Sequence, residues 1–186
     1  MRFTRNLLVL IFTLGFLNTA LASKQEAILG IGKGMDDTLI QSKSISDAEQ
    51  WEISWAWDLE QSFESDYGYA EWWIQAGYME FTGEHQGISD KLTLYQIKPI
   101  LRLYPSGKED SFFIEAGLGA AKLSKKSFEQ IVIQTKGNFV IHAALGWVLG
   151  ESSKLSLRYS HYSNGYTHTP NPGIDSLAIN YHWNFE

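Results

Sequence analysis

The side chains of this sequence best suited to chemistry lie in one stretch, residues 158–175, which reads RYSHYSNGYTHTPNPGID. It ends a run in which apolar and polar residues alternate. His161 and Ser163 are two positions apart, so on a β-strand their side chains share one face. A serine hydroxyl becomes an effective nucleophile when an adjacent base takes its proton, and an imidazole can do so near neutral pH. The spacing therefore predicts a nucleophile with its general base.

A carboxylate joins this pair if the flanking segments form a hairpin. A hairpin centred near His168 places Asp175 opposite His161, Leu177 opposite Tyr159 and Ile179 opposite Leu157. This register matches apolar with apolar side chains and brings the acid, the imidazole and the hydroxyl together. A carboxylate behind an imidazole fixes its tautomer and stabilises the imidazolium. Asn164 and Asn171, in the same loop, could donate hydrogen bonds to the oxyanion of an acyl-transfer intermediate.

These residues belong to a chain dominated by a two-residue period, which is the signal of a half-buried strand. The clearest case is residues 51–60, in which Trp51, Ile53, Trp55, Trp57 and Leu59 alternate with polar or small residues. We expect eight such strands, at residues 26–33, 51–60, 69–81, 91–104, 111–123, 138–149, 153–161 and 175–184. Pro99 is the one proline inside them, and it predicts a local weakening or a bulge.

The links between these segments favour a membrane barrel over a soluble sandwich. The links after the fourth and sixth segments are short, the link after the second is moderate, and those after the first, third, fifth and seventh are longer and polar. Short turns alternating with long loops are typical of outer-membrane barrels with both termini in the periplasm. Eight strands form a small barrel whose interior is filled by side chains. We therefore predict an all-β fold, an eight-stranded antiparallel transmembrane β-barrel.

Charged residues fall on the face of these strands opposite the apolar rows. The set that shares this inward parity is Glu52, Asp58, Glu71, Lys98, Arg102, Glu115, His142 and Arg158. Charges of both signs then meet inside the barrel, where buried charges persist only when they are paired. We predict a structural network of ion pairs and assign none of these residues a catalytic role.

The N-terminus and the composition indicate the compartment. Residues 1–22 combine Arg2 and Arg5 with an apolar core and a small-residue site at residues 20–22, which predicts a secretory signal peptide. Residues 23–186 then form a single barrel domain. The chain has a net charge of −6, and removal of the leader takes away two arginines and no acid, so the mature protein is more acidic still. A strongly acidic protein is not expected to bind nucleic acid. Aromatic residues make up 14% of the chain, a surplus that interfacial girdles of a membrane barrel would use.

The topology predicts where the chemistry takes place. With a periplasmic N-terminus the odd-numbered strands run outward, so the loop after Ser163 is external and the site faces the outer leaflet. Lipid of that leaflet can reach it, and in the outer membrane this lipid is lipopolysaccharide, whose lipid A carries ester-linked acyl chains. The histidines are dispersed without metal-ligand spacing, so we expect neither a metal nor a cofactor.

The same residues resemble a known family. The pattern His161-Tyr162-Ser163-Asn164, followed by Asn171-Pro172-Gly173-Ile174-Asp175, is similar to that of the PagL-type lipid A 3-O-deacylases. These are eight-stranded outer-membrane barrels that hydrolyse the ester at position 3 of lipid A without a metal. The resemblance is confined to the C-terminal part of the chain, and it implies Ser163 as nucleophile, His161 as general base and Asp175 as orienting acid. It also implies Asn164 and Asn171 around the oxyanion.

One position departs from the family pattern, because the family usually has glutamate where this chain has Asp175. The shorter side chain must approach the imidazole more closely or hold it less well. A weaker orienting role would lower the rate of the reaction without abolishing it.

Several alternatives stay open at this point. The same triad could serve an outer-membrane phospholipase or acyltransferase, and a non-enzymatic structural barrel would make the triad accidental. Four lysines in or near the external link after the fifth strand either form a solvated basic loop or contact lipid A phosphates; they are Lys122, Lys125, Lys126 and Lys136. The sequence also leaves open whether the protein forms a homodimer.

Overall fold

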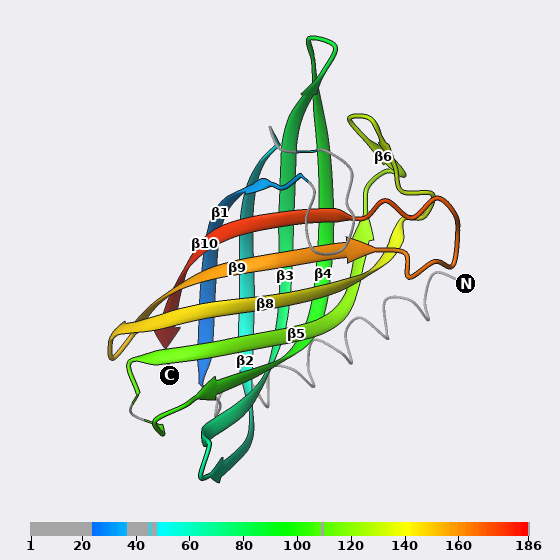
Figure 1. Cartoon of the computed structure of the whole chain (residues 1–186). Coiled ribbons are helices and arrows are strands. Elements are labelled where there is room, and N and C mark those ends of the chain that lie inside the picture. Colours follow the sequence, from blue (N-terminus) through cyan, green and yellow to red (C-terminus); the bar gives the residue numbers. More distant parts are fainter. Residues whose placement is uncertain (1–23, 37–44, 46–47, 109, 186) are drawn as a thin grey trace, which may run out of the picture.

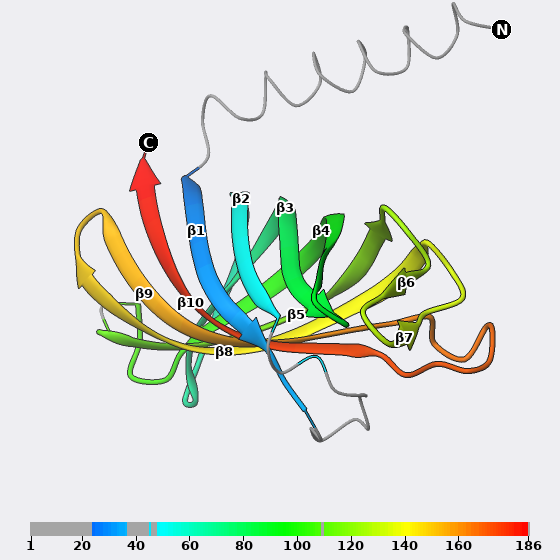
Figure 2. The same cartoon turned by 90° about the horizontal axis from the view of Figure 1, so that it is seen from above.

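The computed structural model describes residues 24–36, 45, 48–108 and 110–185, and these residues form a closed antiparallel β-barrel (Figure 1). Its eight wall strands are β1 (Gln25–Gly34), β2 (Glu49–Ser65), β3 (Gly68–His85), β4 (Ile88–Tyr104), β5 (Phe112–Leu123), β8 (Gly137–Gly150), β9 (Ser153–Ser163) and β10 (Ile174–Phe185). Around the wall they follow the order β1-β10-β9-β8-β5-β4-β3-β2, so that β10 pairs with β1 and closes the ring, which Figure 2 shows from above. The predicted eight-stranded antiparallel barrel is confirmed. The predicted signal peptide lies outside the described residues.

The wall strands bury polar side chains and expose apolar ones. In β10, Leu177 is 38% and Trp183 57% exposed, whereas Asn180 and His182 are fully buried. A barrel in water would show the reverse, because exposed apolar surface is unfavourable there. An apolar outer band around a polar interior is the arrangement of a barrel that faces lipid. Within the described residues, no helix is long and apolar enough to cross a membrane.

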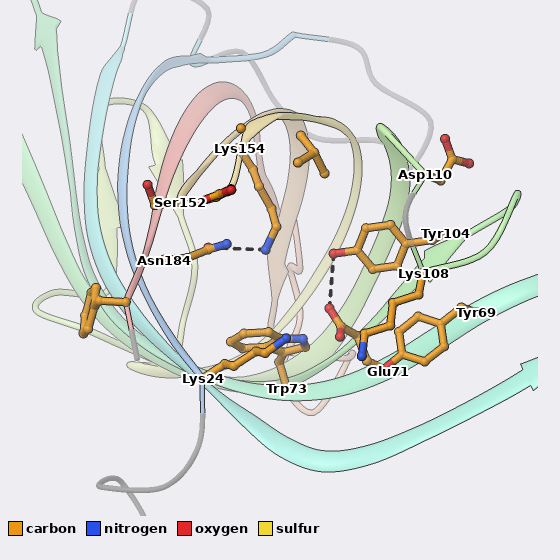
Figure 3. Close-up of a pocket in the computed structure, with 14 residues that line it drawn as sticks. Lys24, Tyr69, Glu71, Trp73, Tyr104, Lys108, Asp110, Ser152, Lys154 and Asn184 are labelled. Atoms are coloured by element: carbon orange, nitrogen blue, oxygen red, sulfur yellow. Dashed lines mark hydrogen bonds between the residues drawn. The ribbon is translucent and has the colours of Figure 1, made fainter.

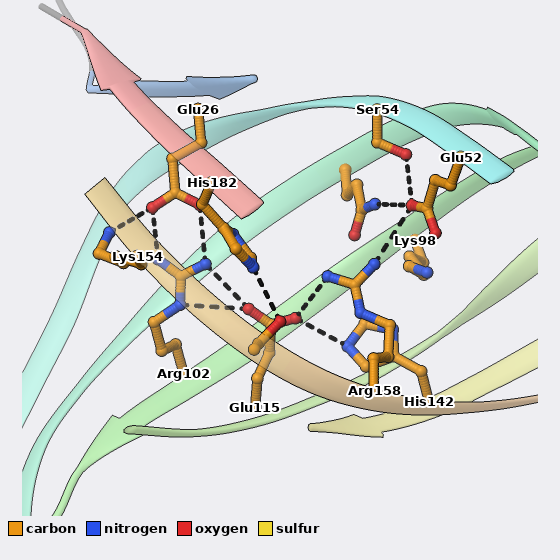
Figure 4. A network of polar contacts seen from close by, with 12 residues as sticks. Glu26, Glu52, Ser54, Lys98, Arg102, Glu115, His142, Lys154, Arg158 and His182 are labelled. Carbon is orange, nitrogen blue, oxygen red and sulfur yellow. Dashed lines mark hydrogen bonds and ion pairs between the residues drawn. The ribbon is translucent and has the colours of Figure 1, made fainter. Parts of the chain in front are cut away.

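A network of ion pairs fills the middle of the barrel (Figure 4). Arg102 donates to the two carboxylate oxygens of Glu26, at 2.7 and 2.9 Å, and to Glu115 at 2.8 Å. Arg158 bridges Glu115 and Glu52, at 3.1 and 3.2 Å. These side chains are all buried, so their charges persist because each has a partner of opposite sign. The network agrees with the structural role predicted from the inward parity.

One expected detail differs in the structure, and of the two alternatives for Pro99 the local weakening is found and the bulge is not. Asp58 is half-buried instead of fully inside, because it lies where the register between β2 and β3 shifts. Pro99 produces no bulge: it pairs with Ile74 of β3, while the ladder between β4 and β5 passes from Ile97 to Ile100 without a pair at the proline. A residue that lacks an N–H can keep its place in a strand if one neighbouring ladder is interrupted.

The links also differ from the expected pattern at two places. β2 and β3 are joined through only Asp66 and Tyr67, and β3 and β4 through only Gln86 and Gly87. The paired strands β3 and β4 instead continue past the apolar stretch and project beyond the barrel as a long hairpin (Figure 1). The two-residue period marks only the half-buried part of a strand, and the polar continuation of the same ladder carries no such signal.

The end of the barrel opposite Gln25 and Phe185 is filled by apolar side chains. The hairpin of β6 (Ser127–Phe128) and β7 (Ile131–Val132) contributes Phe128 and Ile131 to one buried cluster. Phe81 of β3, Tyr162 of β9 and Ile174 of β10 belong to the same cluster. Because Tyr162 and Ile174 stand at the end of β9 and the start of β10, this packing holds the two strand ends on which the predicted site residues lie.

Candidate active site

The β9–β10 hairpin brings the predicted acid and base face to face. Its register pairs Asp175 with His161, Leu177 with Tyr159 and Ile179 with Leu157, as predicted. Leu157 is 41% exposed on the outer face of the wall, and His161 and Asp175 continue its row toward the end of the barrel that the apolar cluster fills. These two side chains therefore belong to the outer face of the wall.

His161 and Asp175 form a buried hydrogen-bonded pair. Nδ1 of His161 lies 2.6 Å from Oδ1 of Asp175, and the two residues are 5% and 0% exposed. An ionised carboxylate can only accept, so Nδ1 carries the hydrogen, and in the neutral imidazole Nε2 then has the lone pair. This tautomer can take a proton at Nε2, which is what a general base must do. The short distance indicates that Asp175 reaches the imidazole in spite of its short side chain.

Two further contacts hold Asp175 in place. The Tyr159 hydroxyl donates to Oδ1 of Asp175 at 2.8 Å. The backbone N–H of Met35, directly after β1, donates to the backbone carbonyl of Asp175 at 2.9 Å. Sequence reasoning placed Tyr159 on the outward row and missed its contact with the acid. The signal that could have found it is its position diagonal to Asp175 across the hairpin, which is within reach of a long aromatic side chain.

Ser163 is the last residue of β9 and stands on the same face as His161. It is half-buried and pairs with Phe139 of β8. In the part of the chain that the structure describes, no hydrogen bond joins the Ser163 hydroxyl to His161. Such bonds are often long or poorly aligned in enzymes without substrate and tighten in the substrate complex. The structure thus brings acid and base into contact and places the serine two residues further along their row.

The two asparagines of the loop between β9 and β10 bond to each other. The backbone N–H of Asn164 donates to Oδ1 of Asn171 at 2.9 Å. The Asn164 side-chain amide donates to the carbonyls of Ile133 and His168, at 3.2 and 3.0 Å. Both Nδ2 hydrogens of the buried Asn164 are therefore engaged in folding the loop. Asn171 is half-buried, and its amide oxygen is fixed by the Asn164 N–H.

An apolar groove of about 750 Å³ runs over the outer face beside this row. Its wall includes Leu157, Leu177 and Ile179, next to the acid and base, and continues to Ile31 and Trp51. A groove of this size and lining suits an acyl chain.

A second cavity, of about 780 Å³, lies at the end of the barrel where β1 begins and β10 ends (Figure 3). Its lining includes Trp73, Tyr104, Glu71 and Lys154. None of the predicted site residues lines it, so it is separate from the triad.

The four external lysines lie at the opposite end of the barrel from this cavity, near β6 and β7. Lys125, one of the four external lysines, forms an ion pair with Asp90 of β4, whereas Lys122, Lys126 and Lys136 are exposed. Among the residues that the structure describes, no group of three or more histidine, aspartate or glutamate side chains is arranged to hold a metal ion.

Comparison with known proteins points to one family. A family model described as "Lipid A 3-O-deacylase (PagL)" matches residues 49–184. A Bordetella bronchiseptica protein named lipid A deacylase PagL is 41% identical over 76 residues, which cover 41% of this chain and 43% of that protein. A Pseudomonas aeruginosa protein of the same name is 28% identical over 129 residues, covering 69% of this chain and 73% of that protein. A crystal structure of the outer membrane enzyme PagL has a similar fold, with a TM-score of 0.68 at 23% identity, over 85% of this chain and 98% of that one.

Proposed function

The chain belongs to the lipid A 3-O-deacylase (PagL) family, and from this premise we propose that it is a bacterial outer-membrane serine esterase that removes the acyl chain ester-linked at position 3 of lipid A. The observation that carries the proposal is the buried Asp175–His161 pair at 2.6 Å on the outer face of the wall. A soluble substrate would be better served by a site inside a water-filled cleft. A site on the lipid-facing wall suits an ester that is itself part of the membrane.

The reaction would proceed in two steps. The Ser163 hydroxyl attacks the ester carbonyl while Nε2 of His161 takes its proton, and Asp175 stabilises the imidazolium that forms. The tetrahedral intermediate then collapses, His161 returns the proton to the sugar oxygen, and the acyl group stays on Ser163. Water attacks this acyl-enzyme with His161 again as base, which releases the fatty acid and restores the serine.

Donors for the oxyanion would come from the loop after Ser163. Asn164 and Asn171 remain the candidates, and the hydrogen bonds favour Asn171. Its oxygen is held by the Asn164 N–H, and no bond from its Nδ2 group is present within the described residues. For Asn164 to act through its side chain, it would have to give up its bond to Ile133 or to His168. An amide held in place before the reaction stabilises developing charge better than one that must reorient.

The apolar groove supports a long-chain substrate. It begins at Leu177, the next residue after Asp175 on the outer face of β10, and includes Leu157 of β9, from which the outward row leads to Ser163. We propose that an acyl chain of the substrate lies in this groove while its ester reaches the serine. The external orientation of the site, toward lipopolysaccharide in the outer leaflet, is part of the same proposal.

Mass spectrometry of lipid A tests the proposal. Outer membranes that contain the wild type should lose one 3-hydroxyacyl chain from position 3, and membranes with Ser163→Ala should not. Ser153→Ala is the matched control, because Ser153 stands on the same face of β9 at its other end, where its hydroxyl contacts Tyr181. Fully acylated lipid A with a folded wild type would overturn the proposal. Cleaved glycerophospholipids in the same extract would then favour a phospholipase.

A further inference from the structure

Tyr159 and His161 donate to the same oxygen of Asp175. The Tyr159 hydroxyl is 2.8 Å and His161 Nδ1 is 2.6 Å from Oδ1. Both donors come from β9 and the acceptor comes from β10. A rotation of the carboxylate that breaks one of these bonds breaks the other, so the tyrosine and the histidine together define the orientation of the acid.

The backbone register explains how Tyr159 reaches the acid. Its direct partner across the hairpin is Leu177, and Asp175 is the diagonal neighbour on the same face. Diagonal pairs are too far apart for short side chains but within reach of aromatic ones. A phenylalanine would fit this lipid-facing position equally well, because Tyr159 lies between Leu157, which precedes it in the row, and Leu177, which is opposite it on β10. The hydroxyl is the part of this residue that packing against lipid does not require.

The burial of Asp175 gives this hydroxyl its importance. Asp175 has no exposed surface, and a carboxylate that has lost its water is stable as an anion only if hydrogen bonds replace the water. An aspartate also has one methylene fewer than a glutamate with which to reach the imidazole. A second donor on the same oxygen holds this short side chain in the one orientation that contacts Nδ1.

We propose that Tyr159 is a positioning residue of the active site, which holds the carboxylate of Asp175 directed at His161. The proposal rests on the function proposed above, because it concerns the acid of that triad. Tyr159 touches neither the serine nor the ester in this scheme, and it acts on the reaction only through Asp175.

A double-mutant cycle measures whether Tyr159 acts through the acid. Tyr159→Phe should lower kcat by about tenfold, the value of a hydrogen bond to a charged group, and leave KM unchanged. In an Asp175→Ala background the same substitution should cost nothing further. Tyr181→Phe is the matched control, since Tyr181 lies on the outer face of β10 and bonds Ser153 at 2.8 Å, away from the site. This control should retain the wild-type kcat.

The outcomes separate this inference from the proposed function. An equal loss for Tyr159→Phe in both backgrounds would mean that Tyr159 contributes packing alone, and this overturns the inference. An active wild type with an unaffected Tyr159→Phe overturns it as well, and leaves the proposed function standing. A folded wild type that cleaves no ester overturns the proposed function, and the inference with it. Heat-modified mobility on gels establishes that each variant has folded.

Discussion

Gly173 lies directly against the imidazole of His161. A β-carbon at Gly173 would come within 2.7 Å of Cε1 of the ring, closer than real β-carbons approach. The φ angle of Gly173 is +70°, in the left-handed region that side chains disfavour. The glycine therefore lets the loop between β9 and β10 close over the base. Both its positive φ angle and its close approach to the His161 ring require a residue without a β-carbon.

Gly173→Ala should displace the imidazole and reduce turnover by roughly a hundredfold, because small misplacements of a catalytic group are costly. Gly87→Ala is the matched control: Gly87 has a φ of +78°, but a β-carbon there meets nothing within 4 Å. The control should suffer the backbone strain and keep its activity. Lipid A deacylation by purified protein in detergent is the measurement. Equal activities of the two variants would show that the contact with His161 has no effect.

Ser163→Ala and His161→Ala should each lose about a thousandfold or more in turnover, because a nucleophile and its base act as a unit. Both variants should still fold, since the barrel interior is untouched. His168→Ala tests whether the loss is specific to His161, because His168 is a second histidine nearby, exposed in the loop after β9, where it contacts Thr167. A similar loss in His168→Ala would mean that the loop, and not the predicted base, is needed for the reaction.

Asp175→Ala should lose less activity than the serine and histidine variants, and Asp175→Glu should not exceed the wild type. The aspartate already makes a bond of 2.6 Å to the imidazole, so a longer side chain gains no contact. The added methylene must also fit into a fully buried position, which costs packing energy. A kcat for Asp175→Glu several times above the wild type would show instead that the short acid holds the base poorly.

The register of β9 and β10 could be predicted because it depends on features that a sequence displays. A slip of one residue would turn Leu177 and Ile179 inward and Ala178 and Asn180 toward lipid. The alternation therefore allows only registers that differ by an even number of residues. Matching apolar residues across the hairpin then selected one of these, and the positions of Asp175 and His161 followed from it.

Other parts of the site could not be predicted from the same signal. The β6–β7 hairpin has two residues in each strand, too few to show a period, yet Ile133 after it receives the Asn164 amide. The contact of Tyr159 with Asp175 is diagonal, and alternation reports only the face of a strand. The projecting β3–β4 hairpin carries mostly polar residues, with Ile88 as an exposed exception, so it shows no apolar alternation that could have predicted it.

Removal of Glu115 should destabilise the barrel strongly. Its carboxylate pairs with Arg102 and Arg158 and contacts His142, and all four side chains are buried. Glu115→Ala takes one carboxylate from each of two buried arginines, which keep their pairs with Glu26 and Glu52, and breaking a buried ion pair costs about 3–5 kcal/mol. Glu64→Ala, exposed in β2, should have no measurable effect. Denaturant unfolding followed by tryptophan fluorescence measures the difference, and wild-type stability of Glu115→Ala would refute the structural role of the network.

Asp90 connects the projecting β3–β4 hairpin to the loop that supports Asn164. Its carboxylate pairs with Lys125 and accepts the Glu129 N–H at 2.7 Å. Burial raises the pKa of Asp90, but the bonds from Lys125 and Glu129 outweigh it and leave the pKa below its usual value. A lowered pKa in the folded state means that this contact stabilises above the unfolded pKa of about 4 and is lost as pH falls through the folded value. The connection is therefore intact at neutral pH.

Asp90→Asn should loosen the segment 124–136 and lower deacylation severalfold, because that segment supplies the Ile133 carbonyl to Asn164. Limited proteolysis at pH 7 should cut this segment faster in the variant than in the wild type. The wild type should approach the variant's rate only in acid below the folded pKa of Asp90. Asp66→Asn, in the β2–β3 turn at the other end of the barrel, controls for the lost charge. Equal cleavage of both variants and the wild type at pH 7 would mean that packing of Phe128 and Ile131 alone holds the segment in place.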